Sequence, residues 1–99
     1  MEKSIERIRT KESQLDRCKE IVSDVEAVLA ELDRSRDEMI SLFRYYGSQE
    51  WYEDRELDLP EDVKAGVLSE DEVYDVITHL RDEAFRMLES ATDILKNRI

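Results

Sequence analysis

Apolar side chains recur every seven residues along the first half of the chain, and this spacing is the strongest constraint on its fold. Two such rows lie three residues apart, as do the core-facing rows of a packed helix. No glycine or proline interrupts residues 3–46, so the sequence predicts one long helix there, ended by Gly47 as a left-handed cap. The first row is Ile8, Leu15, Val22, Leu29 and Phe43, and the second row is Cys18, Val25, Leu32, Met39 and Tyr46.

A second helix is predicted over residues 70–98. Ser69 can cap its start, and Glu72 follows three residues later, which is the spacing of a capping box. Leu68 and Val73 are placed to form a hydrophobic staple across this cap. Apolar residues then recur at alternating spacings of four and three, at Val73, Ile77, Leu80, Ala84, Met87, Ala91 and Ile94.

The connection between the two helices, residues 47–69, contains the only proline and the only tryptophan of the chain. Pro60, followed by two acids, resembles the first turn of a helix, so we expect a short helix near residues 60–65. A further turn is expected at residues 48–54. A structured connection of this kind lets the two long helices fold back as an antiparallel hairpin.

We therefore predict an all-α fold in which residues 1–99 form a single domain. The first helix is about 65 Å long and the second about 43 Å, so part of the first helix has no partner within one chain. Ile21, Val28 and Leu42 also widen its apolar stripe beyond two rows. Pairing of two chains into a helical bundle is the simplest way to bury this surface, so we expect a homodimer.

The net charge of −11 is concentrated in the middle of the chain. Residues 49–75 contain 11 acids and 2 bases, a net charge of −9. Such a segment repels phosphate groups and anionic lipids, so we expect no direct nucleic-acid partner, no membrane partner, and a possible basic protein partner. The sequence has no apolar run near 18 residues and no signal-like apolar region at its start, so we expect a cytoplasmic protein.

The candidate partner-binding residues are aromatic and acidic side chains of the central segment, together with one aromatic side chain on the back of the second helix. Aromatic residues dominate the energetically important positions of protein interfaces. The alternative is that the aromatic residues form a small core that holds the connection against the helix ends. The candidates are Tyr45, Tyr46, Trp51, Tyr52, Glu53, Asp54, Glu56, Asp58 and Phe85.

No catalytic, cofactor or metal-binding motif is present. Cys18 lies in an apolar row and is expected to be a buried apolar residue, and His79 lies outside the apolar stripe and is expected at the surface. The leading interpretation is therefore a non-enzymatic protein-interaction module without a cofactor. Two alternatives remain: an acidic nucleic-acid mimic, and a magnesium-dependent all-helical nucleotide hydrolase. Glu72 and Asp75 have the carboxylate spacing of such hydrolases, but the first helix has no clear matching pair.

Several motifs in the second half of the chain resemble one protein family. These are Tyr45-Tyr46-Gly47-Ser48, then Trp51, Leu59-Pro60 and the run from Gly66 to Asp71. The chain is similar in length and layout to a family of small bacterial all-helical proteins, domain of unknown function 4298. This resemblance implies a bacterial source and a cytoplasmic location, and it implies no activity, substrate or catalytic residue.

Overall fold

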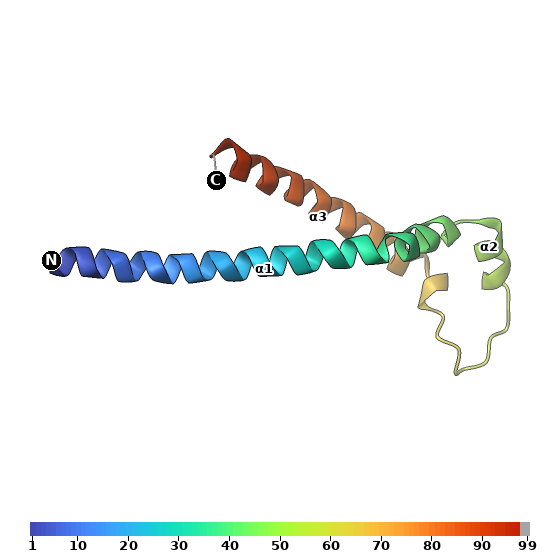
Figure 1. The fold of residues 1–99 in the computed structure, drawn as a ribbon. Coiled ribbons are helices and arrows are strands. Elements are labelled where there is room, and N and C mark those ends of the chain that lie inside the picture. Colours follow the sequence, from blue (N-terminus) through green and yellow to red (C-terminus); the bar gives the residue numbers. More distant parts are fainter. Residues whose placement is uncertain (98–99) are drawn as a thin grey trace. The chain divides into compact units, whose positions relative to one another are not determined.

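The computed structural model describes residues 1–97 and is helical throughout its regular elements (Figure 1). The chain contains α1 (Glu2–Tyr45), α2 (Gln49–Arg55), the short 3-10 helix η1 (Gly66–Leu68) and α3 (Glu70–Lys96). No strand occurs in the described residues, which confirms the all-α prediction. The chain divides into two units, Met1–Met39 and Ile40–Ile99, and each is described by itself. The expected hairpin and bundle stay predictions.

The first unit is the N-terminal part of α1, a regular helix whose surface carries local ion pairs. Arg17 and Glu20 are 3.0 Å apart, and Arg36 and Asp33 are 2.9 Å apart. Exposed pairs of this kind stabilise a helix by only about 0.2–0.5 kcal/mol each. The ion pairs therefore stabilise the helix only slightly. Burial of the apolar stripe would contribute more, but none of its side chains is buried.

No residue of α1 is buried. Side chains of the first apolar row are about half exposed, for example Ile8 at 58% and Val22 at 55%. Cys18 is exposed as well, so the expectation that it is a buried residue is wrong for this structure. The reason is that its row has no neighbouring element against which to pack within Met1–Met39.

The second unit begins with the last turn of α1, which ends one residue before the predicted position. Gly47 has φ +78°, the left-handed conformation expected of a helix cap. Ser48 directly follows, and its Oγ accepts a hydrogen bond of 3.2 Å from the backbone N–H of Trp51. One helix therefore ends and the next begins within three residues.

The short helix of the connection lies at α2 and not near residues 60–65, where it was predicted. Residues 60–65 form only one turn, in which the Val63 N–H donates to the Pro60 carbonyl over 3.1 Å. A helix starting at Pro60 would have Leu59 as its N-cap, and leucine has no side-chain acceptor. Ser48 provides that acceptor, and so the helix forms after Ser48.

The start of α3 is capped by Ser69, as predicted. Its Oγ accepts hydrogen bonds from the backbone N–H groups of Asp71 (3.2 Å) and Glu72 (3.5 Å). The reciprocal bond of a full capping box does not form, because the Ser69 N–H donates to the Gly66 carbonyl over 3.0 Å. The helix ends at Lys96, and the predicted end at residue 98 lies outside the described residues.

Candidate functional site

Trp51 is the centre of a small aromatic cluster that folds the connection. Its side chain is only 3% exposed, and its Nε1–H donates a 2.9 Å hydrogen bond to the Val67 carbonyl. The Tyr46 and Tyr52 rings meet it edge-on, with centroids 5.1 Å and 5.0 Å away. Aromatic pairs in this geometry contribute about 0.5–1.5 kcal/mol each beyond the area that they bury. Trp51 is therefore a core residue here, and its ring is not an accessible contact surface.

Two further contacts join this cluster to the start of α3. The Arg55 guanidinium lies 4.6 Å from the Trp51 ring centroid, and its Nη1 is 3.2 Å from Glu70 Oε1. The Tyr46 hydroxyl donates a 2.8 Å hydrogen bond to the Glu70 carbonyl. Tyr46 thus has a structural role, and the last turn of α1, α2 and the first turn of α3 are held together.

Tyr45 and Asp54 form a second link across the turn between α1 and α2. The Tyr45 hydroxyl donates to the Asp54 carboxylate, and both side chains are half-buried. This hydrogen bond is the main cause that raises the pKa of Tyr45 to about 12, with smaller contributions from burial and from the charges of Asp54 and Glu50. Asp54 is therefore engaged within the protein.

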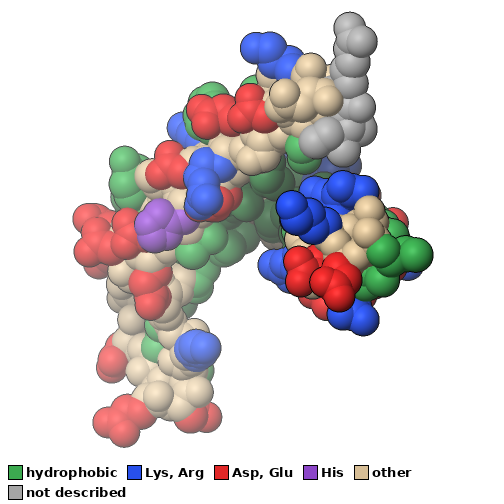
Figure 2. Space-filling model, turned by 90° about the vertical axis from the view of Figure 1, so that its left-hand side faces the viewer, with side chains coloured by type: hydrophobic (Ala, Val, Ile, Leu, Met, Phe, Trp, Pro, Cys, Tyr) green, Lys and Arg blue, Asp and Glu red, His purple; other side chains and the backbone are tan. Residues whose placement is uncertain are grey.

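The remaining candidate residues of the central segment are exposed. Tyr52 is 57% exposed, and the carboxylates of Glu53, Glu56 and Asp58 also face solvent. In the lowest part of Figure 2, which is the loop after α2, several acidic side chains project at the edges beside one basic side chain. These four exposed residues lie within seven positions of the sequence, on α2 and this loop, and together they are here called the acidic face.

Phe85 does not belong to the acidic face. It is 62% exposed and lies 15 residues after Glu70 on α3, which is about 22 Å along the helix. Leu88, one turn further on, is 65% exposed. These residues form a separate apolar surface on the C-terminal half of α3.

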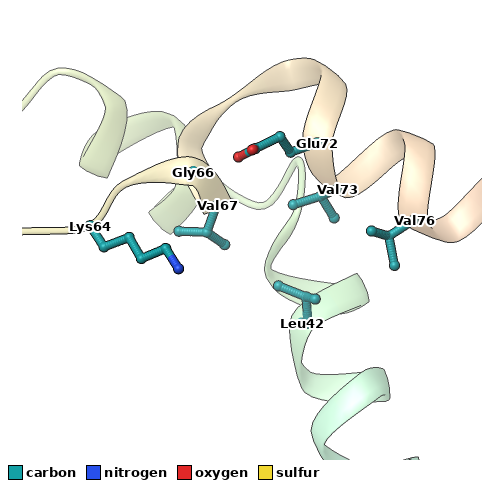
Figure 3. A pocket seen from close by; sticks show the side chains of 7 residues that line it. All are labelled: Leu42, Lys64, Gly66, Val67, Glu72, Val73 and Val76. Carbon is teal, nitrogen blue, oxygen red and sulfur yellow. The ribbon is translucent and has the colours of Figure 1, made fainter.

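An open cavity of about 400 Å³ lies between the end of α1, η1 and the start of α3 (Figure 3). Its walls are Leu42, Val67, Val73 and Val76, with Lys64 at its edge. Its rim also includes Glu72, whose carboxylate points toward Gly66. This cavity could not be predicted from the sequence, because its residues come from three elements. The only local indication was the predicted hydrophobic staple between Leu68 and Val73, because Val73 is one of the cavity walls.

The structure shows no metal-binding cluster among the residues that it describes. Among residues 1–97, no group of three or more histidine, cysteine, aspartate or glutamate residues could hold a metal ion. Glu72 and Asp75 are both exposed, and His79 lies at the surface as predicted. Within the same residues, no helix is long and apolar enough to cross a membrane.

Comparison with known protein families identifies one match. The model of the family described as Domain of unknown function (DUF4298) matches residues 8–90. The chain belongs to the DUF4298 family. The match includes most of α1, all of α2 and η1, and α3 as far as Ser90, which confirms the resemblance seen in the sequence motifs. No curated protein and no solved structure matches this DUF4298 chain.

Proposed function

We propose that this protein is a non-enzymatic protein-interaction module that works as a homodimer and binds a basic protein partner through its acidic face. The observation that carries the proposal is the exposed apolar stripe of α1. Apolar residues recur along this stripe, and many of their side chains are between 38% and 58% exposed. Exposed apolar surface of this extent is typical of an interaction site.

A partner for α1 is also favoured by the energetics of the helix itself. Isolated helices gain little from helix propensity alone, and most helices in proteins are stabilised by packing of an apolar face. Residues 1–39 have such a face, and none of them is buried. Association of two chains supplies the missing packing surface.

The acidic face supports the second half of the proposal. Glu53 stands on α2, which Trp51 and Arg55 hold in place, and Glu56 and Asp58 follow directly after that helix, so a partner meets these carboxylates at a folded element. Charges held in this way raise the rate of encounter with a surface of opposite sign, and salt screens the effect. The net charge of −9 over residues 49–75 selects a basic partner.

Sedimentation equilibrium tests the first half of the proposal. At micromolar concentration, the protein is expected at about twice its chain mass of 11.7 kDa. A monomer over the whole concentration range would contradict the dimer.

Quantitative pull-down with the purified protein as bait tests the second half. Changing Glu53, Glu56 and Asp58 to their amides should reduce capture of basic proteins, and added salt should have the same effect. The matched control changes three exposed acids of α3, Asp82, Glu89 and Asp93, and should leave capture unchanged. Equal capture by both variants would remove the acidic face from the proposal. Tyr45 and Asp54 stay unchanged throughout, because their hydrogen bond is structural.

A further inference from the structure

The two halves of the unit Met1–Met39 carry opposite net charge. Residues 1–19 contain 6 bases and 4 acids, a net charge of +2, whereas residues 20–39 contain 2 bases and 7 acids, a net charge of −5. The reversal falls near the middle of the unit. A two-fold axis perpendicular to the helix brings each half of a helix against the other half of its partner, so this distribution is self-complementary in an antiparallel pair.

We propose that the apolar stripe of α1 binds the same stripe of a second copy in antiparallel orientation, with Ile8 of one chain opposite Leu32 of the other. This inference rests on the homodimer of the proposed function and specifies its interface. The stripe binds a second copy of the chain because the charge reversal lies within the same helix that carries the stripe.

Charge selects the antiparallel orientation. In that orientation each basic half faces an acidic half, whereas in a parallel pair the two halves of net charge −5 face each other. Opposite charges beside an apolar seam set the orientation of helix pairs. The chain's own α3 offers less complementarity, because it contains 8 acids and 3 bases, a net charge of −5.

The two apolar rows, which form the seam between the helices, select the register, that is, which residues of the two chains face each other. In an antiparallel pair each residue of the first row faces one of the second row. With Ile8 opposite Leu32, three further pairs follow: Leu15 with Val25, Val22 with Cys18, and Met1 with Met39. Three polar residues, Ser4, Lys11 and Arg36, also occupy positions in the two rows. In this register Ser4 faces Arg36, and Lys11 faces Leu29, along which its long apolar stem can lie.

Neighbouring registers are less favourable. A shift of seven residues in one direction places Arg36 of one chain opposite Lys11 of the other, so that two positive charges repel each other within the interface. A shift in the other direction places Lys11 opposite Val22 and Ser4 opposite Leu29, so that both polar residues face apolar ones. In the proposed register the overlap covers all 39 residues of the unit, a length of about 58 Å.

Disulfide trapping tests the orientation and the register together. In a Cys18→Ala background, Leu15→Cys and Val25→Cys chains are prepared separately and mixed in a glutathione redox buffer. Only the mixture is expected to form a disulfide dimer, because residue 15 lies opposite residue 25 and about 15 Å along the helix from the other residue 15.

The outcomes separate the inference from the proposed function. A disulfide in either variant alone would show a parallel pair and overturn the inference. A dimer by sedimentation without any disulfide in the mixture would mean that another surface, such as α3, forms the interface. A monomer by sedimentation would contradict the proposed homodimer itself. Helix content by circular dichroism confirms that each variant is folded.

A charge substitution provides an independent readout. In the proposed register Glu26 of one chain lies on the flank of the seam beside Glu12 of the other. Glu26→Lys is therefore expected to lower the dimer dissociation constant by about threefold or more, since two repulsive contacts become attractive. The control Asp24→Lys changes the same charge on the outer side of the helix. Equal dissociation constants for the two variants, or a weaker Glu26→Lys dimer, would overturn the register.

Discussion

The indole Nε1 of Trp51 and the carbonyl oxygen of Val67 are 2.9 Å apart, although the two residues are 16 positions apart in the sequence. This hydrogen bond joins α2 to η1 and closes the loop between them. The connection between α1 and α3 is therefore a folded element with its own small core. The exposed carboxylates of Glu53, Glu56 and Asp58 belong to this folded element, which is why they are candidates for binding a specific partner.

Replacing Trp51 should destabilise the second unit strongly. Trp51→Ala removes a 3% exposed side chain, its hydrogen bond and two aromatic contacts, so unfolding free energy should fall by about 3–5 kcal/mol. Denaturant unfolding measures the loss. Tyr74→Ala is the control, because Tyr74 is 59% exposed and its loss should cost less than about 0.5 kcal/mol. Equal losses for the two variants would contradict a core role for Trp51.

The cap of α3 should be measurable on its own. Ser69→Ala removes the acceptor for the N–H groups of Asp71 and Glu72 and should lower stability by about 1 kcal/mol. Ser23→Ala, at an exposed interior position of α1, should be neutral or slightly stabilising because alanine is the better helix former. A loss below about 0.3 kcal/mol for Ser69→Ala would show that the cap does not hold this helix.

The Tyr45–Asp54 hydrogen bond predicts a specific alkaline sensitivity. Tyrosine in an unfolded chain ionises near pH 10, whereas the pKa of Tyr45 in the folded protein is raised to about 12. Tyr45 therefore contributes stability that is fully present below about pH 10 and is lost as the pH rises toward 12.

Unfolding midpoints at about pH 9 and about pH 11 measure this contribution. Tyr45→Phe should reduce the difference between the two midpoints, and Tyr74→Phe should preserve it because that ring is 59% exposed. An unchanged pH dependence in Tyr45→Phe would show that the hydrogen bond does not persist in solution.

The two glycines should respond differently to alanine. Gly47 has φ +78°, a conformation that strains any residue with a Cβ, so Gly47→Ala should cost about 1 kcal/mol. A Cβ at Gly66 would overlap Glu72 Oε2, the far end of an exposed and flexible side chain. Glu72 can rotate away, so Gly66→Ala should stay within about 0.5 kcal/mol of the wild-type protein. The reverse order of costs in thermal unfolding would refute this assignment.

Both ends of the first long helix were predicted to within one residue, and the start of the second at the correct residue, because their signals are local. The seven-residue spacing, the left-handed Gly47 and the Ser69 cap all act within a few positions. The turn expected at residues 48–54 is the helix α2, whereas the helix predicted near residues 60–65 does not form because Leu59 cannot cap it. A side-chain acceptor at Ser48 was the better signal for a helix start.

Burial in the connection could not be predicted, because it depends on contacts between distant residues. Trp51 needs the Val67 carbonyl, and Asp54 needs the Tyr45 hydroxyl, and neither pair follows from sequence spacing. These contacts engage Tyr45, Tyr46, Trp51 and Asp54 within the protein. The candidates that stay accessible are Tyr52, Glu53, Glu56 and Asp58, together with Phe85 on α3. The open cavity beside Val73 was missed for the same reason.

Trp51 is the only tryptophan of the chain and lies entirely within the second unit. Its fluorescence therefore reports on the aromatic cluster alone, and burial shifts its emission to shorter wavelength than that of a solvated indole. Circular dichroism reports mainly on the two long helices, and α1 includes all of the first unit except Met1. Following both signals during one titration distinguishes melting of the N-terminal helix from opening of the connection, without any added label.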